Sequence, residues 1–137
     1  MSSTKSGYRE IEHTADWEIE VWAPNPAELF IQAARAMMTL SGLRLESEPK
    51  IDRGFSLQAV DLEGLLVAFL SEILFYAEQE NLGFEHYHLT IENFALSAHL
   101  KGAPIRSIDK EIKAVTYHRL AITQTQDGLN TRLVFDV

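Results

Sequence analysis

Two aspartates near opposite ends of the 137-residue sequence have the residue type and placement of a cation site. Asp16 precedes an alternating segment that begins at Trp17, and Asp136 lies between Phe135 and the last residue, Val137. If Trp17 and Phe135 point into the core, strand alternation turns both aspartates away from it. If the two strands are neighbours, Asp16 and Asp136 converge with the main-chain carboxylate of Val137.

Three converging carboxylates need a positive charge among them, because like charges at short range are costly. Oxygen ligands suit a hard divalent cation, Ca²⁺ or Mg²⁺, so one interpretation is a metal site. The other is a plain ion pair. Asp127-Gly128 predicts a tight hairpin in the last third of the chain, and its register places Arg119 opposite Asp136.

The same hairpin register brings histidines to the carboxylates. It places His118 opposite Val137, and His13 could approach from the other end of the chain. Two apolar cross-strand pairs support this register: Ile122 with Leu133, and Leu120 with Phe135. A histidine beside carboxylates can act as an acid or base, or can hydrogen-bond a carboxylate in a purely structural role.

A second group of histidines lies on another predicted hairpin. The segments 84–92 and 95–101 flank the turn Asn93-Phe94, so that His88 faces His99 and His86 lies on the same side. Three imidazoles on one face could hold zinc. The alternative is a solvated polar face, because no acidic partner for the imidazoles is evident there.

Composition and missing motifs exclude several functions. The chain has no cysteine, no phosphate-binding Gly-Lys-Ser/Thr loop and no dinucleotide fingerprint, so an enzyme working alone is poorly supported. Its net charge of −8 argues against strong binding of RNA or DNA. No apolar run approaches the ~18 residues of a membrane span, and the first seven residues are no signal peptide. We therefore expect an acidic cytoplasmic protein that binds no membrane.

Two segments have the pattern of helices. Asn25-Pro26 opens the first with an N-cap and a proline at the first helical position, and Gly42 is a plausible end. The second begins at Asp61 and closes at Asn81 to Gly83. Its apolar face is unusually wide, which indicates a helix wedged between two surfaces or laid across a sheet.

The remaining sequence alternates like half-buried strands. Segments 17–23 and 55–59 alternate in this way, and two hairpins follow the second helix. Strands in runs, broken by two helices, predict an α+β fold in which the two helices pack on antiparallel or mixed sheet. We expect residues 1–137 to form a single domain, with residues 1–7 flexible.

Four blocks of sequence together resemble the archease family. They are His13-Thr14-Ala15-Asp16, Asp61-Leu62-Glu63-Gly64-Leu65-Leu66-Val67, Lys113-Ala114-Val115-Thr116-Tyr117-His118 and Phe135-Asp136-Val137. The resemblance runs from Tyr8 to Val137, with the blocks in the family's order. One departure is Trp17-Glu18, where many members have a small residue followed by Gly.

The resemblance implies a helper of the RtcB-type RNA ligase, which joins RNA ends in tRNA splicing and RNA repair. Such a helper promotes guanylylation of the ligase and its multiple turnover, and does not itself join RNA. The family's metal site maps onto Asp16, Asp136 and the carboxylate of Val137, with calcium as the expected cation. Supporting residues would be His13, Lys113, His118 and Arg119.

Two other functions stay open beside the ligase activator. A general chaperone or modulator of RNA-modifying proteins would use the wide apolar face of the helix at 61–80 as a docking surface. A metal-dependent hydrolase would use the three carboxylates and His118. No organised nucleophile or phosphate-binding loop accompanies those acids, so we rank the hydrolase last.

Overall fold

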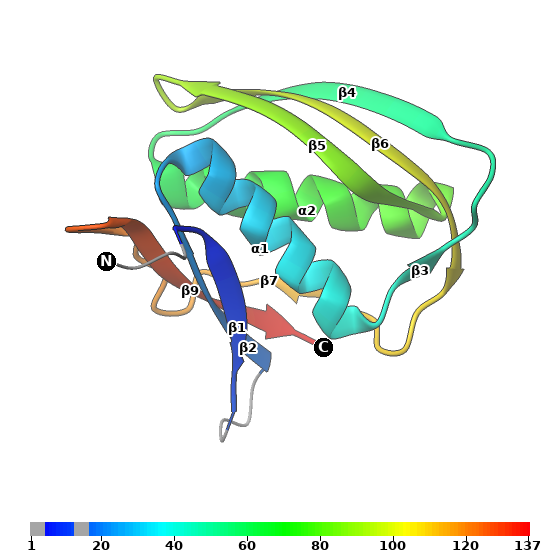
Figure 1. Ribbon diagram of the computed structural model, residues 1–137, viewed down its shortest axis with the longest axis horizontal. Helices are drawn as coiled ribbons and strands as arrows, with labels where there is room; N and C mark the ends of the chain where they lie inside the picture. Colours follow the sequence, from blue (N-terminus) through cyan, green and yellow to red (C-terminus); the bar gives the residue numbers. More distant parts are fainter. Residues whose placement is uncertain (1–4, 13–16) are drawn as a thin grey trace.

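The computed structural model describes residues 5–12 and 17–137, which form two antiparallel sheets with two helices between them (Figure 1). The helices are α1 (Pro26–Ser41) and α2 (Leu62–Glu80). The strands are β1 (Gly7–Ile11), β2 (Trp17–Ala23), β3 (Arg44–Leu45), β4 (Ile51–Gln58), β5 (Leu82–Glu92), β6 (Ala95–Ser107), β7 (Ala114–Val115), β8 (Thr123–Thr125) and β9 (Gly128–Asp136). The α+β class predicted from the sequence is confirmed.

Both helices begin and end where the sequence predicts. The side chain of Asn25 caps α1 by accepting a hydrogen bond from the Glu28 amide at 2.9 Å, and Asp61 caps α2 through the Gly64 amide at 2.7 Å. Gly42 ends α1 in the left-handed region (φ 70°), which glycine adopts without strain. Asn81 ends α2 in the same region (φ 53°).

One sheet is formed by strands from both ends of the chain. Its order is β1-β2-β9-β7, with β8 also pairing with β9. Strand β2 alternates as predicted, because Ile19, Val21 and Ala23 are buried while Glu18 and Glu20 are less buried. The second strand of the chain therefore pairs with the last.

The other sheet is formed by the middle of the chain, with β6 between β4 and β5 and with β3 pairing at the far end of β6. The turn at Asn93 and Phe94 has positive φ at both residues, as tight hairpins require. Leu89 faces Ala98 and Ile91 faces Leu96, which is the predicted register.

The helices fill the space between the sheets, so α2 is wedged between two surfaces. Its buried side chains occupy several faces: Leu65, Leu66, Val67, Phe69, Leu70, Ile73 and Tyr76. Phe69 stacks on Phe30 of α1 with ring centres 5.8 Å apart and lies 6.3 Å from Phe55 of β4. One aromatic column therefore joins both helices to the second sheet. No helix in the described ranges is long and apolar enough to cross a membrane.

Candidate functional site at the end of the β2–β9 pair

The pairing of β2 with β9 brings the sequence neighbours of both aspartates together. Trp17, the first residue of β2, lies opposite Phe135 of β9. Asp16 precedes Trp17 in the sequence, and Asp136 follows Phe135. Phe135 is buried and Asp136 is exposed, as alternation predicts. Asp16 and His13 themselves lie outside the described residues.

Strand β7 covers the other side of Asp136. Ala114 lies directly opposite Asp136, and Val115 lies opposite Phe135. The amide of Lys113 donates a hydrogen bond of 2.7 Å to the main-chain carbonyl of Asp136. Of the proposed supporting residues, Lys113 is thus held beside Asp136 by its backbone, while its side chain is exposed.

The predicted register of the last hairpin is wrong. Thr125 pairs with Gly128 and Thr123 with Asn130, a shift of two residues from the pairing that we expected. The Thr125 hydroxyl donates to the Gly128 carbonyl at 3.1 Å and accepts from the Asp127 amide at 3.3 Å. These bonds start the turn at Thr125, because a threonine hydroxyl can replace a backbone partner in a turn.

The shift removes Arg119 and His118 from the predicted places opposite Asp136 and Val137. The β8–β9 ladder ends at Thr123, and residues 117–120 form a turn in which Arg119 has a φ of 53°. Arg119 donates from Nε to Nε2 of His118 at 3.1 Å. The ion pair between Arg119 and Asp136 is not among those in the described part of the chain.

The segment that contains His118 is instead tied to α2. The amide of Ile122 donates to Oε2 of Glu63, in the first turn of α2, at 2.9 Å. On the other side, the amide and the hydroxyl of Thr116 both donate to the Val134 carbonyl at 3.0 Å. The chain therefore leaves β9 after Thr116 and returns to it at β8, with the turn of residues 117–120 between them.

Further along the same sheet, one carboxylate has a perturbed acidity. Asn130 donates to Oε2 of Glu20 at 3.0 Å, and Nε of Arg9 lies 2.7 Å from Oε1. The hydrogen bond from Asn130, with the bond and charge of Arg9, holds the pKa of Glu20 below its ordinary value, although partial burial raises it. This carboxylate belongs to a structural network between β1, β2 and β9.

The three histidines of the second sheet do not form the zinc site that we considered. His88 faces His99 across β5 and β6, as predicted, and His86 faces Lys101. Within residues 5–12 and 17–137, however, no group of three or more His, Cys, Asp or Glu side chains is placed to hold a metal ion. The solvated polar face is the interpretation that fits.

Residues Asp136 and Val137 offer oxygen atoms at an exposed strand end. Asp136 is exposed and Val137 is half-buried. Carboxylate oxygens are the donors that hard divalent cations prefer, so these residues fit such an ion chemically. Sequence reasoning missed Ala114 as the partner of Asp136, because a strand of two residues gives no alternation to detect.

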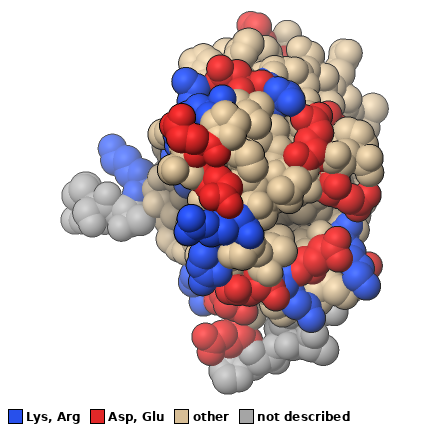
Figure 2. Space-filling model, turned by 90° about the vertical axis from the view of Figure 1, so that its right-hand side faces the viewer, with Lys and Arg blue, Asp and Glu red and all other residues tan. Residues whose placement is uncertain are grey.

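The charged surface is mixed rather than basic. Figure 2 shows acidic and basic side chains interspersed over the face that carries the β3 edge of the molecule. Several cations of the described residues form ion pairs: Lys50 lies 2.7 Å from Glu85, and Arg53 lies 2.6 Å from Glu80. Such pairing reduces the positive charge that is available for binding a phosphate backbone.

These features define the class of protein as an α+β domain in which two helices lie between two antiparallel sheets and the second strand pairs with the last. The model of the archease protein family (MTH1598/TM1083) matches residues 8–137. The chain belongs to the archease family, as the sequence resemblance predicted.

Individual relatives match over nearly their whole length. Protein archease of Methanosarcina barkeri is 32% identical over 149 residues, covering 100% of both chains. A protein archease-like of Drosophila melanogaster is 32% identical over 134 residues, covering 90% of this chain and 84% of the relative.

Solved structures share the fold. The crystal structure of an archease from Thermotoga maritima, described as a possible chaperone, has a TM-score of 0.70 at 25% identity and covers 94% of this chain and 96% of that one. The solution structure of protein 1598 of Methanobacterium thermoautotrophicum has a TM-score of 0.68 at 20% identity, covering 96% and 99%.

Proposed function

We propose that this chain is a cytoplasmic activator of an RtcB-type RNA ligase in tRNA splicing and RNA repair. It promotes guanylylation of the ligase and multiple turnover, and does not itself catalyse joining. The observation that carries the proposal is membership of the archease family over residues 8–137, together with the pairing of Trp17 and Phe135, the sequence neighbours of Asp16 and Asp136.

The proposal includes a divalent cation, with calcium as the preferred ion. Asp16, Asp136 and the main-chain carboxylate of Val137 would hold it. The fit rests on the described residues: Asp136 is exposed at a strand end, Val137 follows it, and the facing Ala114 brings no charge to neutralise them. When bound, the ion would supply positive charge that stabilises anionic groups.

The residues of this protein would hold the carboxylates in place for the ligase and would not catalyse a step themselves. The Lys113 amide and the pairing of β9 with β2 and β7 hold the backbone of Asp136, so its carboxylate projects from a fixed strand end. A rigid anionic tip of this kind can enter the mouth of the ligase's active site and favour the conformation ready for guanylylation. Its effect on the ligase would then be a population shift.

The proposal is tested by assaying guanylylation of the ligase with labelled GTP, with and without this protein. We expect Asp16→Ala and Asp136→Ala to lose the stimulation while circular dichroism shows the native fold. Undiminished stimulation by both folded variants would contradict the metal site. Failure of the wild-type protein to stimulate any RtcB-type ligase would contradict the function itself.

A second test uses the terminal carboxylate. Fusing a tag after Val137 turns its carboxylate into an amide, so we expect stimulation of the ligase to be lost. The same tag fused before Met1 is the control and should be harmless. Equal activity of the two tagged proteins would exclude the terminal carboxylate from the site.

The chaperone alternative loses its main support. It relied on the apolar face of the helix at 61–80 as an exposed docking surface, and most of that face is buried between the two sheets. Light-scattering protection of an unrelated aggregating protein separates the two functions, since a specific activator should give none.

A further inference from the structure

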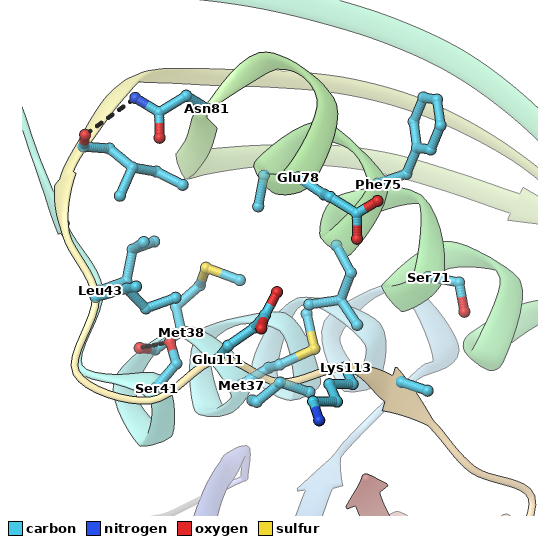
Figure 3. Close-up of a pocket in the computed structure, with 16 residues that line it drawn as sticks. Met37, Met38, Ser41, Leu43, Ser71, Phe75, Glu78, Asn81, Glu111 and Lys113 are labelled. Atoms are coloured by element: carbon cyan, nitrogen blue, oxygen red, sulfur yellow. Dashed lines mark hydrogen bonds between the residues drawn. The ribbon is translucent and has the colours of Figure 1, made fainter. Parts of the chain in front are cut away.

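A cavity of about 500 Å³ opens between the C-terminal halves of the two helices (Figure 3). It is lined from α1 by residues such as Met37 and Met38, from α2 by Leu74 and Phe75, and by several residues of 105–114, which run from the end of β6 to the start of β7. Cavities of this size commonly receive side chains or small ligands.

The rim of the cavity is held in place by hydrogen bonds. Nδ2 of Asn81, at the end of α2, donates to the Ile105 carbonyl at 3.2 Å (Figure 3). At the end of α1, the Ser41 carbonyl accepts from the amides of Asp109 and Lys110 at 2.9 and 3.1 Å. The segment that closes the cavity is therefore tied to both helices, and the cavity is preformed.

The lining is mostly apolar and partly exposed. Five large hydrophobic residues are exposed among the described residues, and two of them, Phe75 and Ile108, line this cavity at 53% and 44% exposure. Exposed apolar side chains gathered around a hollow indicate a surface that another molecule covers.

Two carboxylates give the cavity a negative rim. In Figure 3 the carboxylate of Glu111 points into the cavity toward α2, which carries Glu78, while the amino group of Lys113 points away. Neither carboxylate forms an ion pair in the described part of the chain. An occupant that carries positive charge beside its apolar group would complement both features.

The cavity adjoins the candidate site at Asp136. Lys113 and Ala114 line the cavity, and the same two residues contact Asp136, one through its amide and the other as the facing residue of β9. A partner that reaches Asp136 would therefore also cover the mouth of the cavity.

We propose that this cavity is the docking site for an apolar side chain of the partner ligase, carried on a segment that also bears Lys or Arg. The inference rests on the proposed function and adds a contact surface to it. A second copy of this chain is a poor occupant, because it would bring its own net charge of −8 against Glu78 and Glu111.

The binding test uses the full-length ligase and measures its Kd for variants of this chain by calorimetry. Ile108→Ser and the double variant Glu78→Lys/Glu111→Lys should each raise Kd by about tenfold, a loss that only a minority of interface residues cause when they are substituted. Val60→Ser is the apolar control, since Val60 is 90% exposed and does not line the cavity. Glu72→Lys, also outside the cavity lining, is the charge control on α2; neither control should change Kd.

Measuring the affinity for the ligase and the stimulation of guanylylation separately distinguishes this inference from the proposed function. Ile108→Ser should recover full stimulation of guanylylation at saturating concentration, whereas Asp136→Asn should bind but not stimulate. Unchanged Kd for both cavity variants, with wild-type binding intact, would overturn the docking site and leave the proposed function standing.

A separate experiment tests the chemistry of the cavity without the ligase. Backbone NMR of the whole protein is followed during titration with a short amphipathic helix of Leu and Lys, and with a matched helix of Leu and Glu. The Leu–Lys helix should shift the resonances of Ile108 and Glu111, and the Leu–Glu helix should not. Equal shifts with both helices, or shifts elsewhere, would overturn the inference.

Two other occupants would also be recognised and would overturn the proposal. A dimer in analytical ultracentrifugation that Ile108→Ser dissociates would assign the cavity to a second copy. A small-molecule adduct in native mass spectrometry that the same substitution removes would assign it to a small ligand.

Discussion

The cross-strand contact between Ala114 and Asp136 offers a quantitative test of the candidate site. Directly opposed residues of an antiparallel pair have Cβ atoms about 5 Å apart on one face. The substitution Ala114→Lys therefore puts an ammonium within reach of the Asp136 carboxylate. Ala114→Glu puts a like charge in the same place.

The expected interaction energy follows from the distance between the two charges and from the exposure of Asp136. Two unit charges about 5 Å apart in a water-like dielectric interact by roughly 1 kcal/mol. Screening and side-chain entropy reduce exposed pairs to about 0.2–1 kcal/mol, and Asp136 is exposed. We expect Ala114→Lys to gain about 0.5 kcal/mol from this contact and Ala114→Glu to lose about the same.

The assay is urea unfolding followed by circular dichroism, in a double-mutant cycle with Asp136→Asn. The cycle isolates the pair from other charges near position 114, such as Glu111 and Lys113. The two coupling energies should have opposite signs and differ by about 1 kcal/mol. Both should shrink in 1 M salt, where the screening length falls to about 3 Å.

Arg119 provides the comparison that decides between the two registers. The hairpin register predicted from the sequence places Arg119 opposite Asp136, whereas the structure places Ala114 there. A cycle of Arg119→Glu with Asp136→Asn should therefore give no coupling energy. Coupling at Arg119 that exceeds coupling at Ala114, or equal signs for the Lys and Glu variants, would refute the geometry of the site.

Three further predictions concern the scaffold. Phe69→Ala should lower the free energy of unfolding by about 3–5 kcal/mol in the same urea assay, because Phe69 is fully buried in the aromatic column. Phe75 is exposed, so Phe75→Ala should lower it by less than about 1 kcal/mol. Gly102→Ala should cost about 1–3 kcal/mol or more in urea unfolding, since an added Cβ would collide with the Gly83 carbonyl of β5, and a loss below about 0.5 kcal/mol would contradict that close approach. Because the pKa of Glu20 is lower in the folded protein than its ordinary value of 4.5, ionised Glu20 stabilises the fold above pH 4.5, and this contribution is lost as the pH falls through the folded pKa. The free energy of unfolding should therefore fall less steeply below pH 4.5 in Glu20→Gln than in the wild-type protein.

The helices could be predicted because their signals are local. Asn25 and Gly42 bound α1, and Asp61 and Asn81 bound α2, as their capping chemistry indicates. The hairpin at Asn93 is equally local, since a tight turn and an apolar alternation fix one register. These elements need no information from distant parts of the chain.

The register predicted for the last hairpin is wrong for a physical reason that is visible at Thr125. Asp127-Gly128 is a strong turn signal, but the threonine hydroxyl bonds both Gly128 and Asp127, so the turn moves by one residue and the strand register shifts by two. Since the apolar pattern of the strand repeats every two residues, the shifted register leaves the same faces buried. Apolar alternation therefore could not distinguish the two registers, although it could show which side faces the core.

Because alternation fits both registers equally well, the candidate site could be predicted only in part. Alternation requires Asp136 to point away from the core in either register, so its exposure follows from the sequence alone. The residue facing Asp136 depends instead on where the segment of β7 joins β9, and that is fixed by long-range contacts such as the bonds from Lys113 to Asp136 and from Thr116 to Val134. The cavity has the same origin, since its walls come from both helices and the segment 105–114. A register-dependent site is therefore best tested by couplings between facing residues, because single substitutions report exposure but not pairing.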